Sequence, residues 1–200
     1  KTSMSEQLTL SVDLHESARF DNFLETGNLE LVQALDLAGH GRGEPFIYCW
    51  GPEGAGKSHL LQAVCHAANN LSLAPVYLPL KNLVSHTPAV LDDLEKLQLV
   101  CIDDVDAIAG RPDWEEAFFH FFNRMHDAKK RLIVTGRVAP TSLGLALPDL
   151  VSRLSWGVVY QVNVLSDEGK MQALKLRAKH RGIELPDPVL DFMLRHWPRD

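Results

Sequence analysis

A glycine-rich segment that ends in a lysine and a serine carries the clearest chemistry in this sequence. Residues 51–58 read Gly-Pro-Glu-Gly-Ala-Gly-Lys-Ser, between the apolar run Phe46 to Trp50 and a helical pattern. Glycines let backbone N–H groups turn towards phosphate oxygens, and the following helix directs its positive end at the same anion. Lys57 would add positive charge beside the β- and γ-phosphates, and the Ser58 hydroxyl would bind Mg²⁺. The predicted nucleotide-binding residues are Gly51, Pro52, Glu53, Gly54, Ala55, Gly56, Lys57, Ser58 and the adjoining His59.

A second group of chemically suitable residues is the acidic pair Asp103 and Asp104. The pair follows the apolar run Leu99 to Ile102, as in the Walker-B element of nucleotide-hydrolysing proteins. Asp103 is predicted to share the Mg²⁺ with Ser58, and Asp104 to orient an attacking water. A buried strand that ends in an acidic turn is the competing interpretation, and the preceding phosphate loop favours the functional one.

Two further residues are candidates for contact with the γ-phosphate. Thr135 ends the predicted strand Arg131 to Thr135, and we expect this strand to lie between the phosphate-loop strand and the acidic strand. Thr135 is then a candidate sensor residue, although an ordinary threonine at a strand end fits the same pattern. Arg153 lies near the end of a short helix and could stabilise charge on a neighbour's nucleotide, or could simply be a solvated arginine.

These residues require a framework of short strands that alternate with helices. Apolar runs predict five strands, at Phe46–Trp50, Val76–Leu80, Leu99–Ile102, Arg131–Thr135 and Val158–Val162. Helical spacing and capping signals predict helices at Leu29–Ala38 and Lys57–Ala68, and helices that open at Pro88, at Asp113 with Glu116 as a capping box, and at Ser166. The alternation predicts an α/β fold with a five-stranded parallel sheet covered on both faces.

Composition narrows the class of protein. The chain has 200 residues, 46% of them hydrophobic and 23% charged, which suits a globular protein with one sizeable core. We see no run long and apolar enough to span a membrane and no signal peptide, and three cysteines without close pairing suit the cytoplasm. The net charge of −6 argues against a broad DNA-binding face, so we expect no sequence-specific DNA binding.

Several segments together resemble one family. Phe20-Asp21-Asn22-Phe23, Gly27-Asn28, the phosphate loop, the acidic strand and Ser152 to Gly157 are similar to the core of the DnaA-type AAA+ family. Leu147 to Leu150 and Leu165 to Glu168 are most similar to its truncated regulatory members. The resemblance covers essentially the whole chain and implies an AAA+ P-loop NTPase that binds ADP or ATP with Mg²⁺.

The resemblance also implies roles for residues that the pattern alone leaves open. Arg153 matches the arginine finger that acts in trans, and Arg199 matches the sensor II arginine of a helical lid. The arm residues Gln7, Leu8, Leu10 and Val12 resemble a motif that binds the DNA polymerase sliding clamp, although Val12 stands where a leucine is usual. Gly136 and Arg137 replace the Ser-Asp usual after the sensor threonine.

We therefore expect an N-terminal arm at 1–18, an AAA+ core at 19–164 and a partial helical lid at 165–200. A further helix is expected to begin within the lid, at Pro186–Trp197. The leading hypothesis is a regulator with weak ATPase activity of its own. It would bind ADP, the clamp and the DnaA initiator, and would stimulate hydrolysis of initiator-bound ATP through Arg153. A self-acting helicase loader or clamp-loader subunit is the alternative, a small-molecule kinase is a weaker one, and a homodimer is possible.

Overall fold

A five-stranded parallel sheet forms the centre of the structure, a computed structural model that describes residues 14–15, 18–180, 182–186, 188–189 and 192. The strand order is β2-β3-β4-β1-β5. The strands are β1 (Phe46–Trp50), β2 (Val76–Pro79), β3 (Leu99–Asp103), β4 (Arg131–Gly136) and β5 (Val158–Gln161). All neighbouring strands are parallel, so the predicted sheet is confirmed.

The predicted position of β4 is confirmed, because it pairs with β1 on one side and with β3 on the other. Cys49 lies opposite Thr135 in the first pairing, and Ile102 lies opposite Val134 in the second. Parallel strands bring their carboxyl ends to the same edge, where α/β proteins place their ligand sites. The register therefore brings the ends of β1, β3 and β4 together.

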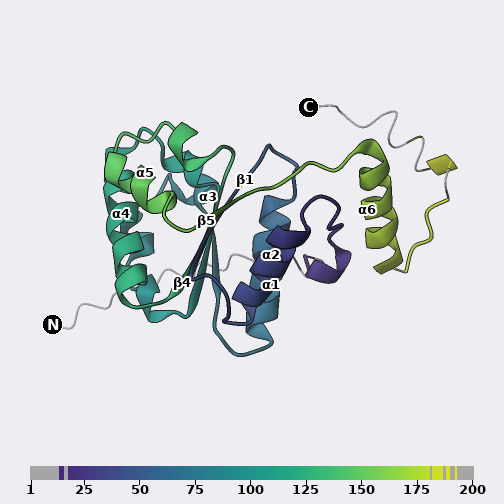
Figure 1. The fold of residues 1–200 in the computed structure, drawn as a ribbon, viewed down its shortest axis with the longest axis horizontal. Helices are drawn as coiled ribbons and strands as arrows, with labels where there is room; N and C mark the ends of the chain where they lie inside the picture. Colours follow the sequence, from purple (N-terminus) through teal and green to yellow (C-terminus); the bar gives the residue numbers. More distant parts are fainter. Residues whose placement is uncertain (1–13, 16–17, 181, 187, 190–191, 193–200) are drawn as a thin grey trace.

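Helices cover both faces of the sheet, as predicted (Figure 1). On one face lie α1 (Leu29–Gly39) and α2 (Lys57–Asn69), and on the other lie α3 (Leu80–Leu83), α4 (Pro112–Asp127) and α5 (Pro148–Leu154). The helix α6 (Asp167–His180) follows β5 at the side of α1 and α2. Its predicted cap is confirmed, since Ser166 Oγ accepts a hydrogen bond from the Gly169 N–H at 3.1 Å.

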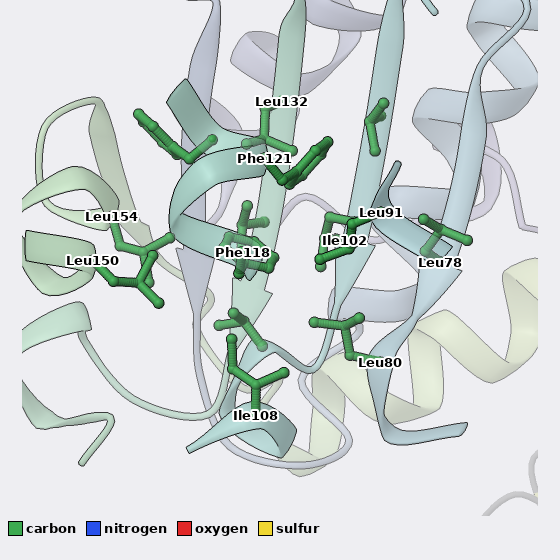
Figure 2. Close-up of a cluster of buried hydrophobic side chains, with 14 of the residues drawn as sticks. Leu78, Leu80, Leu91, Ile102, Ile108, Phe118, Phe121, Leu132, Leu150 and Leu154 are labelled. Carbon is green, nitrogen blue, oxygen red and sulfur yellow. The ribbon is translucent and has the colours of Figure 1, made fainter. Parts of the chain in front are cut away.

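The core is built from strand residues that alternate between two apolar layers. Tyr48 and Ile102 face the layer under α4 and α5, while Ile47 and Cys101 face the layer under α1 and α2. The α4 side chains Phe118 and Phe121 are completely buried in the first layer, beside Ile102 and Leu132 (Figure 2). Burial of each large apolar side chain contributes roughly 1.5–3 kcal/mol, and this packing holds the strand ends in place.

Two expected helix starts differ from the structure. The segment at Pro88 forms two short 3-10 turns, η2 (Pro88–Leu91) and η3 (Leu94–Lys96), because Asp93 between them has a positive φ of 65°. The helix expected to be capped by Asp113 begins instead at Pro112, whose missing N–H suits the first helical position. Val76–Leu80 ends one residue early, since Leu80 begins α3.

Two of the other 3-10 turns join strands to helices near the edge of the sheet. They are η4 (Val105–Ile108), directly after the acidic pair, and η5 (Pro140–Ser142), between β4 and α5; η1 (Phe20–Asn22) precedes α1. The further helix expected at Pro186–Trp197 lies mainly outside the described residues. None of the helices in the described ranges combines the length and the apolar character that crossing a membrane requires.

Candidate nucleotide-binding site

A pocket of about 320 Å³ opens where β1, β3 and β4 end. This volume is at the lower end of the range for small-molecule sites. The phosphate loop and the start of α2 form one wall, and residues that follow β2, β3 and β4 form the other. Its lining residues are Glu53, Gly54, Gly56, Lys57, Ser58, His59, Lys81, Asp104, Asp106, Ala107 and Arg137.

The phosphate loop is held by Lys57, the first residue of α2. Its Nζ donates hydrogen bonds to the carbonyl oxygens of Gly51, at 2.7 Å, and Pro52, at 2.9 Å. Gly56 has a φ of 93°, and a Cβ there would lie 2.7 Å from the ring of Phe23, so the turn requires glycine. The loop thus places an ammonium group and the positive end of a 13-residue helix at one wall of the pocket.

These features fit a nucleoside polyphosphate. Glycine-rich turns at a helix N-terminus offer backbone N–H groups to an anion, Lys57 supplies a full positive charge, and Ser58 supplies a hydroxyl. Within the described ranges, no cluster of three or more His, Cys, Asp or Glu side chains could hold a metal ion by itself. A Mg²⁺ ion here would therefore depend on phosphate oxygens and waters, as is usual for this ion.

The buried carboxylate of Asp103 joins three strands. Its Oδ2 accepts a hydrogen bond from the Tyr77 hydroxyl of β2 at 2.7 Å, and its Oδ1 accepts one from the Thr135 hydroxyl of β4. Asp103 is only 1% exposed, and Thr135 is completely buried. Thr135 is thus next to the acidic pair, but it is not among the residues that line the pocket.

Asp104 differs from Asp103 because its side chain borders the pocket. Its backbone is left-handed, with a φ of 56°, and its N–H donates to Thr135 Oγ1 at 3.2 Å. Burial raises the pKa of the Asp104 carboxyl, and the charges of Asp103 and Asp106 raise it further, while nearby lysines oppose the rise. A half-buried carboxyl with a raised pKa beside a phosphate loop can orient or deprotonate a water.

Three charged residues of the pocket were not predicted from the sequence. Two of them are Arg137, the first residue after β4, and Asp106. The Arg137 Nε donates a hydrogen bond to Asp106 Oδ2 at 2.9 Å. Its backbone N–H also donates to Asp106 Oδ1, so the two residues join the ends of β3 and β4. Lys81, in α3, is the third. Their only sequence signal was their position shortly after predicted strands.

Residues before α1 also lie against the site. The His59 ring donates through Nε2 to the Arg19 carbonyl oxygen at 2.9 Å, and its ring centroid lies 5.6 Å from that of Phe23. His59 therefore borders the predicted nucleotide pocket and also holds the preceding segment on α2. Further along, His15 N donates to Gln62 Oε1 at 2.9 Å. These contacts fasten the start of the described chain beside the phosphate loop.

Arg153 lies in the last turn of α5 and is not among the lining residues of the pocket. Its guanidinium carbon lies 5.4 Å from the ring centroid of Trp156. The other predicted partner- and nucleotide-binding residues, Arg199 and the clamp-motif residues Gln7, Leu8, Leu10 and Val12, lie outside the described residues.

The sheet order, with the phosphate loop and the acidic pair at one edge, defines a P-loop NTPase of the AAA+ class. The chain belongs to the family of bacterial DnaA ATPase domains, because the model of that family matches residues 14–161. Residues 167–200 match a second family model, described as the lid domain of Hda. Together the two matches agree with a DnaA-like AAA+ regulator of the Hda type.

Solved structures of DnaA have the same fold. Domain III of DnaA from Thermotoga maritima is 26% identical, with a TM-score of 0.78 over 91% of this chain and 82% of that chain. AMPPCP-bound DnaA from Aquifex aeolicus is 25% identical, with a TM-score of 0.72 over 92% of this chain and 61% of that one. A DnaA bound to AMPPCP and single-stranded DNA is 25% identical, with a TM-score of 0.72 over 90% of this chain and 60% of that one. This chain thus spans about 60% of the length of the latter two.

Proposed function

We propose that this protein regulates the initiation of DNA replication by stimulating hydrolysis of ATP bound to a DnaA-type initiator, which inactivates the initiator. The observation that carries the proposal is the position of Arg153. It lies at the end of α5, outside the lining of the chain's own pocket. The sequence resemblance implies that Arg153 is the arginine finger. An arginine in that position can act on a nucleotide held by a neighbouring molecule.

The chain's own pocket would bind ADP or ATP with Mg²⁺. Lys57 would contact the phosphates, Ser58 and Asp103 would share the metal, and Asp104 with Thr135 would act on the terminal phosphate or its water. Arg199 would complete the site from the lid. Binding of AMPPCP by two similar DnaA structures supports a nucleotide here. We propose that this nucleotide tunes the regulator and that the chain's own turnover is weak.

The sliding clamp is the proposed second partner. We propose an arm at 1–18, a core at 19–164 and a lid at 165–200. The arm would bind the clamp through the motif residues Gln7, Leu8, Leu10 and Val12. The described start of the chain supports a tether at this place, because His66 Nε2 donates to the His15 carbonyl oxygen at 3.0 Å. An arm attached to α2 beside the pocket would join clamp binding to nucleotide binding. The protein would work in the cytoplasm. If it forms a homodimer, the dimer would use the same arginine finger, Arg153.

The decisive experiment measures hydrolysis of ATP bound to the initiator, with the clamp, ADP and this protein present. Arg153→Ala should reduce the stimulated rate roughly 10³-fold, the low end for loss of an arginine finger. Arg42→Ala, at an exposed arginine after α1, is the matched control and should leave the rate unchanged. An Arg153→Ala variant that stimulates the initiator normally would contradict the proposal.

A self-acting ATPase, such as a helicase loader or clamp-loader subunit, is the second candidate. It is favoured by Asp104, which borders the chain's own pocket in a position to act on bound ATP. Rapid ATP hydrolysis by the chain alone, lost in Asp104→Asn, would support it. Clamp binding with and without residues 1–13 separates the two candidates, because only the tethered regulator needs that segment. The position of β4 between β1 and β3 speaks against a nucleotide kinase.

A further inference from the structure

The residue beside the proposed arginine finger is an exposed tryptophan. Trp156 keeps 57% of its surface exposed, and its ring lies under the guanidinium of Arg153, with 5.4 Å between the guanidinium carbon and the ring centroid. Its backbone N–H donates to the Arg153 carbonyl oxygen at 3.1 Å, so the two residues share one tight turn at the end of α5. Exposure of such a large aromatic ring forgoes the stabilisation that its burial would provide.

Trp156 is held in place by elements other than its own helix. Its ring centroid lies 4.5 Å from that of His126, in α4, and the ring borders a groove whose floor includes Phe46, Phe122 and Met125. The next residue, Gly157, has no room for a side chain against Phe46 of β1. The tryptophan therefore has a fixed position relative to the sheet, although one side of it remains open to solvent.

Arg153 is held by this ring and not by an acidic group. In the part of the chain that the structure describes, no carboxylate forms an ion pair with Arg153, whereas Arg124 and Arg137 pair with Glu95 and Asp106. An aromatic face attracts a guanidinium but leaves its charge and its hydrogen-bond donors free. A carboxylate would neutralise the charge that a finger must deliver to a phosphate.

We propose that Trp156 is a positioning residue for Arg153: its ring orients the guanidinium before the partner arrives, so that less side-chain freedom is lost in the reactive complex. The inference rests on the proposed function, because it requires Arg153 to act on a nucleotide held by another molecule. Because the guanidinium acts on charge that develops in the transition state, this preorganisation should raise the rate of the assembled complex more than its formation. Trp156 itself need not touch the nucleotide.

The test is a double-mutant cycle on hydrolysis of initiator-bound ATP, measured at rising concentrations of this protein. Trp156→Ala should lower the maximal stimulated rate about three-fold to ten-fold while the half-saturating concentration stays the same. Trp156→Phe, which keeps an aromatic face, should restore most of the rate. Leu37→Ala removes another exposed apolar side chain, on α1, and should change nothing.

The decisive arm combines both substitutions. Once Arg153 is alanine, Trp156→Ala should cause no further loss, because the ring has nothing left to orient. An equal loss with and without Arg153, or a raised half-saturating concentration alone, would overturn the inference and make Trp156 a contact residue for the partner. A normal rate in Arg153→Ala alone would instead refute the proposed function. Thermal unfolding of each variant checks its fold, and the phenylalanine variant keeps the test valid if the alanine variant unfolds.

Discussion

Tyr77 has the largest unpredicted role among the side chains of the candidate site. Its buried hydroxyl donates to Asp103, and burial, followed by the charge of Asp103, raises its pKa far above the ordinary value, while hydrogen bonding to Gln62 and Ser58 opposes the rise. The hydroxyl thus contacts the buried carboxylate and interacts with the phosphate-loop serine. Both are proposed to share one Mg²⁺ ion, and groups that orient metal ligands affect metal affinity strongly.

Tyr77→Phe should therefore weaken the Mg²⁺ dependence of nucleotide binding. We expect the concentration of Mg²⁺ needed for half-maximal tightening of nucleotide binding to rise roughly ten-fold or more, while affinity measured in EDTA stays the same. Titration with a fluorescent ADP analogue measures both quantities. Tyr160→Phe, at a tyrosine on β5, is the control. If the two variants needed the same Mg²⁺ concentration for half-maximal tightening of nucleotide binding, Tyr77 would have only a packing role.

Asp104 should show a pH-dependent cost of folding. Because the pKa of its carboxyl is raised in the folded protein, ionisation opposes folding at pH values above that pKa. Below the ordinary value of about 3.9 the carboxyl is protonated in both states and the cost disappears. Asp104→Asn should thus have the same Tm as the parent near pH 3.5 and a higher Tm at pH 7.

Thermal unfolding between pH 3.5 and 8 provides the measurement. Asparagine also tolerates the left-handed backbone of residue 104, so the substitution adds no strain there. Asp113→Asn is the control, because Asp113 lies in the exposed first turn of α4, where the helix dipole favours a negative charge. It should lower the Tm slightly at pH 7. A Tm difference for Asp104→Asn that does not change with pH would contradict the assignment.

At the scale of elements, Glu115 joins α4 to the loop before α5. Its side chain is 1% exposed, and its two oxygens accept hydrogen bonds from the Gly110 and Leu147 N–H groups, each at 2.9 Å. Leu147 directly precedes α5, so this carboxylate fixes the start of the helix that carries Arg153. Removal of the carboxylate would leave two buried donors without an acceptor, which is costly.

Glu115→Ala should lower the free energy of unfolding by about 2–4 kcal/mol. Urea denaturation measures the change. Glu116→Ala, next to it and exposed, should change the value by no more than about 0.5 kcal/mol. Equal stability of the two variants would show that the buried hydrogen bonds are replaced when the carboxylate is lost.

Helix starts show where local patterns were insufficient. Asp113 and Glu116 have the spacing of a capping box, yet Pro112 begins α4, and the neighbouring Glu115 bonds to a distant loop instead. The strands were predicted more accurately, because runs buried on both faces are apolar throughout, as in Leu99 to Ile102. Local capping signals compete with tertiary contacts that no short window of sequence contains.

At the scale of the whole molecule, Asn28 fastens the segment before α1 to the segment that leads into α6. Asn28 is 3% exposed; its Nδ2 donates to the Asn163 carbonyl oxygen at 3.1 Å, and its Oδ1 accepts from the Asn163 N–H at 2.8 Å. Asn163 Nδ2 also donates to the Gly27 carbonyl oxygen at 2.7 Å. The two segments, 135 residues apart, therefore depend on one reciprocal pair of amides.

Asn28→Ala should lower the free energy of unfolding by about 2 kcal/mol, and the Tm by roughly 4–8 °C for a chain of this size. Hydrogen exchange should also quicken at residues 162–166, because their attachment is lost. Asn82→Ala, at an exposed site on α3, is the control. Unchanged exchange in this segment would mean that other contacts hold it.

Short stretches of the sequence were enough to predict the phosphate loop, the acidic pair, the five strands and the short helix of Arg153. Each of these depends on a contiguous run in which glycine, apolar or charged residues have one physical use. Other contacts became known only from the tertiary structure. Tyr77 donates a hydrogen bond to Asp103, and Arg137 pairs with Asp106. Arg153 packs on the ring of Trp156 and does not line the nucleotide pocket of this chain. Strand register and packing bring such partners together across many residues, and a local pattern contains no information about either.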